Sequence, residues 1–187
     1  MSRPRSEEKR LALLTAAAET VSTNGLGAPT SLMARQAGVA EGTLFRYFPT
    51  KDDLLNAVYI HLTQQAYSAI CARFPAGAPL ETRLRAVWNS YIDWGLENSA
   101  ANEAMTQLAV STVLTESARA EADAMFSGLV PGLSEAALFR EQPHTFADAV
   151  FGSLAKITMD FAAREPDRIE AYKASGFAII AKLYGHA

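Results

Sequence analysis

The stretch PTSLMARQAGVAEGTLFRYFPTKDDLL, residues 29–55, decides the fold of this chain. It predicts two short helices over residues 29–37 and 41–48, separated by a tight turn in which Gly38 takes a positive φ. Pro49 ends the second helix, because the residue before a proline is pushed out of the helical region. This layout is typical of a DNA-binding element that enters a groove.

One face of the second helix carries side chains suited to DNA. Leu44 and Phe48 share the opposite face, with Phe45 beside them, and are available for packing. A glycine has no side chain to keep the DNA backbone away. A threonine hydroxyl can donate to phosphate or its methyl can contact a thymine methyl, and an arginine can bind guanine. The DNA-suited face presents Glu41, Gly42, Thr43, Arg46 and Tyr47.

Further helices are predicted on both sides of this pair. The preceding helix runs from Ser6, its expected cap, to about Asn24. The following helix begins with a capping box of Thr50 and Asp53 and continues to Phe74, a rod of about 30 Å. This rod starts at the DNA-binding segment and ends in the body of the chain, so we expect it to carry motion between them.

The net charge of −3 is divided unevenly along the chain. Residues 1–51 hold seven basic groups against four acids, whereas residues 52–187 hold ten basic groups against sixteen acids. The division suits a basic segment that meets phosphate and an acidic body that stays clear of it, although a solvated imbalance without function is the alternative. Arg3 and Arg5 either extend the basic segment as a short arm or belong to a disordered terminus.

The composition predicts a soluble globular protein. Apolar residues make up 49% of the 187, enough for a sizeable core, and no apolar run approaches the roughly 18 residues needed to span a bilayer. The polar start of the chain lacks the apolar segment of a secretory signal. We therefore expect a cytoplasmic protein with no membrane partner.

Residues able to carry catalysis or bind metal are few and scattered. Cys71 is the only cysteine, which excludes an internal disulfide and a thiolate-cluster zinc site, and we expect it to be a buried structural thiol. His61, His144 and His186 are far apart in the sequence, so no metal or other cofactor is expected. No HExxH, P-loop, GxSxG or GxGxxG motif occurs. An enzyme or small-molecule carrier is therefore the competing class, without a catalytic constellation to support it.

The segment AGVAEGTLFRYFPTKDDLL, with PTSLMA before it, resembles the helix-turn-helix of TetR/AcrR-family transcriptional regulators. The resemblance implies a three-helix DNA-binding domain, a long fourth helix, and a helical body that dimerises and binds an inducer. It implies DNA contacts at Thr43 and Tyr47 and a phosphate contact at Lys51, with further contacts from Thr30 or Ser31. The predicted DNA-binding residues are Thr30, Ser31, Gly42, Thr43, Arg46, Tyr47 and Lys51.

Two alanines depart from the commoner family pattern. Ala40 stands where a serine often caps the recognition helix, and Ala28 where a threonine often precedes the helix before it. Neither side chain can accept a bond from a free amide, a loss of about 1 kcal/mol each. Both helices are still expected, with weak local caps.

The body beyond Pro79 contains five predicted helices and no alternating strand pattern. They cover about residues 80–97, 101–114, 116–130, 144–164 and 167–184. The predicted fold is therefore all-α, with about nine helices. An N-terminal three-helix helix-turn-helix DNA-binding domain covers residues 1–50, and a helical ligand-binding and dimerisation domain covers residues 51–187.

Aromatic and acidic residues gather in two of these helices. Trp88, Tyr91 and Trp94 lie three apart, and so do Asp148 and Phe151, which therefore share a helical face. A carboxylate beside an aromatic wall suits a planar cation. Core aromatics with a surface aspartate are the plain alternative.

The segments VWNSYIDWGLEN, LAVSTVLT, ADAMF and TMDFAAREP resemble the body of RamR-type repressors. This TetR-family subgroup controls an activator of multidrug efflux and is released by hydrophobic, often cationic compounds. Matching positions imply an aromatic ligand site made of Tyr59, Trp88, Asp148 and Phe151. Thr63 stands where the subgroup can carry a lysine and Leu84 where it can carry a threonine, so cationic or neutral aromatic ligands are favoured.

The last two predicted helices are apolar over more than one face. Ile157 and Phe161 on the first, and Phe177 and Ile179 on the second, exceed what a single small core needs. An isologous four-helix interface between two copies would bury the surplus. A homodimer of this kind predicts a palindromic operator.

Together these features predict a ligand-responsive transcriptional repressor and not an enzyme. It would bind double-stranded operator DNA as a homodimer and be released by a hydrophobic, aromatic or cationic inducer. Its targets would be a multidrug efflux activator or efflux genes. The alternative is a TetR-family regulator of a metabolic pathway, such as fatty-acid or catabolic metabolism.

Overall fold

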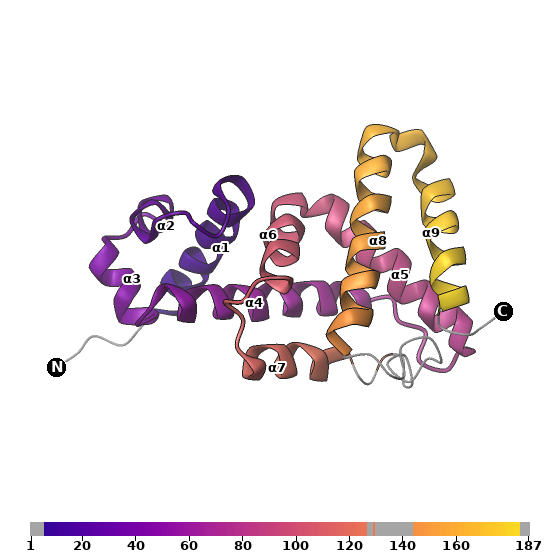
Figure 1. Cartoon of the computed structure of the whole chain (residues 1–187), viewed down its shortest axis with the longest axis horizontal. Helices are drawn as coiled ribbons and strands as arrows, with labels where there is room; N and C mark the ends of the chain where they lie inside the picture. The colour runs from indigo at the N-terminus through magenta and orange to yellow at the C-terminus, as the bar shows by residue number, and fades with distance from the viewer. Residues whose placement is uncertain (1–5, 127–128, 130–143, 184–187) are drawn as a thin grey trace. The chain divides into compact units, whose positions relative to one another are not determined.

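The computed structural model describes residues 6–126, 129 and 144–183, and all regular structure in this part of the chain is helical (Figure 1). This confirms the all-α prediction. The helices are α1 (Glu7–Asn24), α2 (Thr30–Gln36), α3 (Glu41–Tyr47), α4 (Lys51–Cys71), α5 (Leu80–Glu97), α6 (Ser99–Ala109), α7 (Glu116–Phe126), α8 (His144–Arg164), the 3-10 turn η1 (Pro166–Arg168) and α9 (Ile169–Leu183). The predicted basic arm with Arg3 and Arg5 lies outside the described residues.

The helices divide into two compact units. The first contains Met1–Gln64 and Ser99–Ala122, and the second contains Gln65–Asn98 and Asp123–Ala187. α4 therefore contributes its first two-thirds to one unit and its last turns to the other. The functional boundary expected at residue 50 stays a prediction.

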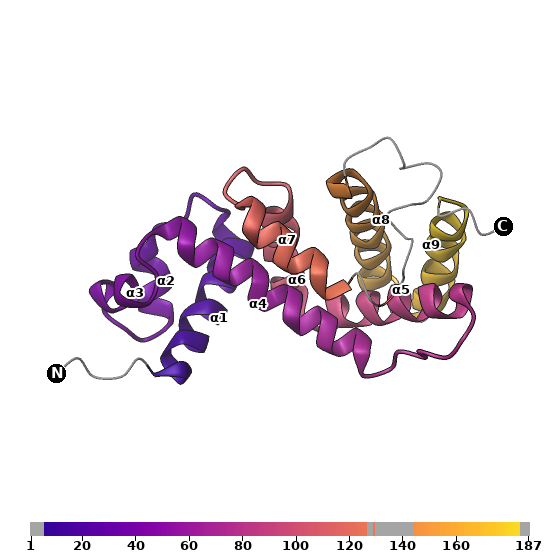
Figure 2. The same ribbon diagram turned by 90° about the horizontal axis from the view of Figure 1, so that it is seen from below.

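The first unit is built on α1. Leu13, Leu14 and Val21 are fully buried in α1, which contacts α2 and α6. Figure 2 shows α6 and α7 beside the middle of α4. Gly38, with φ 69°, makes the turn between α2 and α3, as expected.

Local capping differs from expectation at one helix and agrees at two. The side chain of Ser6 makes no cap bond, so that prediction is wrong; its backbone N–H donates to Tyr47 Oη at 2.9 Å. Ala40 is the N-cap of α3 and offers no side-chain bond. At α4 the capping box is confirmed, because Asp53 N–H donates to Thr50 Oγ1 and Thr50 N–H donates to Asp53 Oδ2, both at 3.0 Å.

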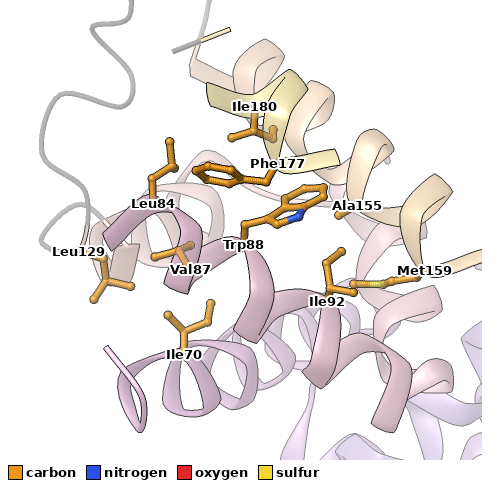
Figure 3. Close-up of a cluster of buried hydrophobic side chains, with 10 residues drawn as sticks. All are labelled: Ile70, Leu84, Val87, Trp88, Ile92, Leu129, Ala155, Met159, Phe177 and Ile180. Atoms are coloured by element: carbon orange, nitrogen blue, oxygen red, sulfur yellow. The ribbon is translucent and has the colours of Figure 1, made fainter. Parts of the chain in front are cut away.

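The second unit is an antiparallel pair, α8 and α9, packed against α5 (Figure 1). Its core is centred on Trp88, which is fully buried (Figure 3). The cluster comprises Ile70, Leu84, Val87, Trp88, Ile92, Leu129, Ala155, Met159, Phe177 and Ile180. The Trp88 ring packs directly on Gly176 of α9. A Cβ added at Gly176 would overlap the ring and lie 2.9 Å from Thr158 Oγ1.

The single cysteine is not where the sequence suggested. Cys71 is the last residue of α4 and is exposed, so the expected buried thiol is wrong. Successive helical positions are about 100° apart, and Ile70 already points into the core. Cys71 therefore turns away from it.

No helix in the described part of the chain is both long and apolar enough to cross a membrane.

Candidate functional site

The exposed side of α3 carries most of the residues predicted to contact DNA. Leu44 is fully buried and Phe48 nearly so, which orients the helix. Gly42 and Arg46 are exposed as a result, and Thr43 and Tyr47 are half-buried. A Cβ added at Gly42 would meet no atom within 4 Å, so the surface beside it is open.

Tyr47 and Lys51 are fixed by hydrogen bonds to other parts of the first unit. Tyr47 Oη accepts the bond from Ser6 N–H, and Lys51 Nζ donates to the carbonyl of Leu26 at 2.6 Å. Each keeps donor capacity, because the phenol proton and two ammonium protons are not used in these bonds. Both can therefore donate to a phosphate without losing their present contact.

The two predicted contacts at the start of α2 differ. Ser31 is exposed, whereas Thr30 is half-buried and donates through Oγ1 to Glu41 Oε1 at 2.6 Å. Glu41 was placed on the DNA-suited face by its spacing but was not among the predicted contacts. Phe45, expected beside the packing residues, is 41% exposed.

Trp88 and Phe151, two of the predicted ligand-site residues, lie together in the second unit. Their rings meet edge to face with centroids 5.4 Å apart. Phe151 also contacts Tyr91 at 5.6 Å, and Tyr91 stacks on Trp94 at 6.0 Å. The spacing of Trp88 and Tyr91 was a sufficient signal to include Tyr91, which the sequence prediction left out.

Trp88 is a core residue as well as an aromatic neighbour of Phe151. Its ring is fully buried, and its Nε1–H donates to the carbonyl of Lys173 at 2.9 Å. A ligand can therefore reach this ring only after the core has opened. Half-buried Phe151 and Tyr91 are the more accessible part of the aromatic group.

The other two ligand-site residues are not brought into this group by the described contacts. Tyr59 belongs to the first unit. Asp148 lies on α8, one turn before Phe151, but its side chain is outside the described part of the structure. Thr63, on α4, donates to the carbonyl of Tyr59 at 2.8 Å and is buried.

A buried lysine forms ion pairs next to the aromatic group. Lys173 is 7% exposed, and its ammonium contacts Asp93 at 2.6 Å and Glu170 at 2.9 Å. Burial lowers the pKa of Lys173, but the hydrogen bonds and charges of Asp93 and Glu170 outweigh it and hold the pKa above its ordinary value. The lysine is therefore charged, and it joins α5 to α9.

An open apolar hollow of about 390 Å³ lies on α8 and α9. Its lining is Phe146, Ala149, Val150, Ser153, Leu154, Ile157 and Ile179. Phe146, Ile157 and Ile179 are each about half exposed. Neither Trp88 nor Phe151 lines the hollow, although its lining residues Val150 and Leu154 pack against the cluster around Trp88.

Among the described residues no cluster of three or more histidine, cysteine or acidic side chains could hold a metal ion.

The N-terminal segment is similar in sequence to known proteins. Residues 13–58 match the model of the bacterial regulatory proteins, tetR family. This segment of the chain is therefore similar to the N-terminal part of tetR-family regulatory proteins. The HTH-type transcriptional repressor LfrR of Mycolicibacterium smegmatis is 36% identical over 63 residues, which are 34% of this chain and 33% of that protein. The match thus spans about a third of that repressor's length.

Solved structures resemble this chain over nearly its whole length. A tetR family transcription regulator from Shewanella sp. PV-4 has a TM-score of 0.73 at 24% identity, covering 94% of this chain and 96% of its own. LfrR from Mycobacterium smegmatis in complex with proflavine has a TM-score of 0.65 at 24% identity, covering 96% and 97%. FadR from Bacillus subtilis in complex with stearoyl-CoA also has a TM-score of 0.65, at 18% identity, covering 95% and 99%. At these identities the likeness shows the fold, a TetR-type helix-turn-helix followed by a helical body.

Proposed function

We propose that this chain is a TetR-family regulator, a ligand-responsive repressor that binds double-stranded operator DNA as a homodimer. The observation that carries the proposal is the exposed side of α3. Gly42 and Arg46 are exposed there beside Tyr47, and the space at Gly42 is open. A recognition helix that enters the major groove needs such a surface, with donors for phosphate and for base edges.

The DNA contacts in this proposal are Thr43, Tyr47 and Lys51 to phosphate, Arg46 to a base, and the backbone at Gly42. Ser31 adds a hydroxyl at the start of α2. The hydroxyl proton of Thr30 is used within the protein, in the bond to Glu41. Tyr47 and Lys51 are held in position before DNA arrives, so less side-chain entropy is lost on binding.

A homodimer is proposed through α8 and α9. Phe146, Ile157, Phe161 and Ile179 are between 45% and 55% exposed, and three of them line the open hollow. A second copy related by a two-fold axis would cover these side chains. The two recognition helices would then read a palindromic operator with half-site centres about 34 Å apart.

The proposed inducer is an aromatic, cationic or neutral compound that binds near Phe151 and Tyr91, with Tyr59, Trp88 and Asp148 as further members of the site. Phe151 and Tyr91 offer partly exposed ring surface. The likeness to LfrR supports this class, since that protein was solved with proflavine, a planar aromatic dye. Release would follow if the ligand binds a conformation with poor DNA affinity more tightly than one with good affinity. Efflux genes or their activator are the proposed targets.

A metabolic regulator is the second candidate. It is favoured by the equal TM-score of FadR, which was solved with stearoyl-CoA. The identity of FadR is 18%, lower than the 24% of LfrR, and LfrR also matches at 36% over 63 residues. We therefore rank it below the drug-responsive candidate.

Substitution of Gly42 by alanine tests DNA binding without disturbing the fold. A methyl group meets nothing in the free protein, and alanine favours a helix over glycine by about 1 kcal/mol, so stability should rise slightly. Operator affinity should nevertheless fall, because the methyl group would hold the DNA backbone away. The measurement is fluorescence anisotropy with a duplex chosen from the DNA upstream of the gene that encodes this protein. Unchanged operator affinity would show that the exposed side of α3 at Gly42 does not contact the DNA.

The ligand class is tested by adding proflavine or stearoyl-CoA to the same protein–DNA complex. We expect proflavine to release the DNA and stearoyl-CoA to have no effect at equal concentration. Asp148→Asn should weaken the response to proflavine more than the response to a neutral aromatic dye of the same size. Release by stearoyl-CoA alone would favour the metabolic candidate.

A further inference from the structure

We propose that Glu41 determines operator specificity by accepting a hydrogen bond from a cytosine amino group, and that Thr30 positions its carboxylate. The inference rests on the proposed DNA-binding function and adds a base preference to it. It gives Thr30 a role through Glu41 instead of a direct phosphate contact.

The geometry places these two side chains together at the turn between α2 and α3. Thr30 begins α2 and Glu41 begins α3, eleven residues later. The positive φ of Gly38 folds the chain back between them. Thr30 Oγ1 then donates to Glu41 Oε1 at 2.6 Å, a length typical of a hydroxyl bound to a carboxylate. The carboxylate is thereby fixed in direction although Glu41 is exposed.

This carboxylate keeps most of its acceptor capacity for a ligand. An ionised carboxyl group has about four lone-pair sites, of which the Thr30 bond uses one. The next residue, Gly42, has open space around its Cα. A base edge can therefore approach Glu41 without a neighbouring side chain in the way.

The chemistry of the major groove selects cytosine for such a group. Guanine presents only acceptors there, and thymine presents an acceptor and a methyl group, so both oppose a carboxylate. Adenine presents an amino donor beside the N7 acceptor, which repels the second carboxylate oxygen. Cytosine presents its N4 amino donor and is the one base with no acceptor at this edge.

Thr30 cannot donate to Glu41 and to a phosphate at the same time, because a hydroxyl has a single proton. A carboxylate at the DNA surface is also repelled by phosphate, so Glu41 lowers affinity for sequences that give it no amino partner. That penalty against wrong sequences is a usual source of specificity. The competing interpretation is that the Thr30–Glu41 bond only ties α2 to α3, whose N-cap residues make no side-chain cap bonds.

Selection of full-length protein against a random-sequence duplex library separates these interpretations. Wild type should enrich a palindromic site with one cytosine in each half-site that Glu41→Ala no longer requires. Glu41→Gln should move the preference at that position to adenine, whose N6 and N7 suit an amide. Replacing the cytosine in a fixed duplex should weaken wild-type binding on the order of tenfold and Glu41→Ala binding little.

Substitutions at Thr30 test its positioning role. Thr30→Val keeps the shape and removes the hydroxyl, so the cytosine preference should weaken while other positions are unchanged. Thr30→Ser should restore it.

Identical base preferences for wild type and Glu41→Ala would overturn the proposal. This includes the case in which Glu41→Ala has a lower thermal stability and binds every duplex more weakly by the same factor. If wild type enriches no duplex, the proposed function fails, and this inference fails with it.

Discussion

Different interactions stabilise the interior of each of the two compact units. In the first unit, which also has a buried apolar core around α1, several polar groups near the surface form hydrogen bonds between segments distant in sequence. In the second, helices pack around one buried tryptophan and a buried lysine that forms ion pairs. Directional bonds at a partly exposed surface contribute about 1 kcal/mol each and can be exchanged for water, whereas a close-packed core tolerates little change. The surface hydrogen bonds of the first unit are therefore easier to exchange than the packing around Trp88 in the second.

Three long-range contacts characterise the first unit. Ser6 N–H donates to Tyr47 Oη across 41 residues, and Lys51 Nζ donates to the Leu26 carbonyl across 25. Asn56 bonds to the segment 113–115, more than 55 residues away. Residues proposed for DNA contact are thus part of the bonding that holds this unit.

In the second unit the largest effect is expected from Trp88→Ala. The ring is fully buried, packs on Phe151, and loses its bond to the Lys173 carbonyl, so stability should fall by about 3–5 kcal/mol. Urea denaturation measures this as a lower midpoint. Trp88→Phe keeps an aromatic ring without the N–H and should cost clearly less. A loss under about 1 kcal/mol for Trp88→Ala would mean that the cluster does not hold the unit.

The ion pair should show an asymmetry between its partners. Asp93→Asn leaves the ammonium of Lys173, whose side chain is 8% exposed, with only the exposed Glu170 as a charged partner. We expect a loss of about 1–2 kcal/mol, below the range for a fully buried pair because the Asp93 side chain is 34% exposed. Lys173→Met fills the buried space with an apolar chain and leaves a carboxylate that water can reach, so it should cost less. Equal losses in urea titrations of the two variants would contradict this order.

The contrast also explains which features could be predicted from sequence. Helices follow from local patterns, so α3 and the turn at Gly38 were predicted almost to the residue, and so was the start of α4, which ends at Cys71, three residues before the predicted Phe74. The capping box of Thr50 and Asp53 is equally local, since its two residues are three apart.

Features that depend on distant segments were missed. The bond from Ser6 N–H to Tyr47 Oη was not expected, because no pattern near Ser6 indicates a partner 41 residues away. Trp88 was predicted for a ligand site from residue type, but its burial is set by α9, where Gly176 leaves room for the ring. The family resemblance predicted residue types for a ligand site and could not show which rings are accessible.

Substitution of Asn56 tests the difference between the two units with the smallest expected change in stability. Its Nδ2 donates to the carbonyls of Asp52 at 2.8 Å and Val113 at 3.0 Å, while its Oδ1 accepts from Thr115 N–H at 2.9 Å. Thr115 Oγ1 in turn accepts from Ala118 N–H in the first turn of α7. One side chain on α4 therefore fixes the connection between α6 and α7.

Asn56→Ala should cost about 1 kcal/mol, because part of the lost bonding is replaced by water. Asn98→Ala is the matched control in the second unit, since the Asn98 amide donates only to Trp94 four residues earlier in its own helix, and it should cost a few tenths of a kcal/mol. Hydrogen exchange adds a local readout, as the Thr115 amide should lose protection in Asn56→Ala and keep it in Asn98→Ala. If both variants lose the same stability and Thr115 stays protected, long-range polar bonds do not distinguish the first unit, and its adaptability needs another cause.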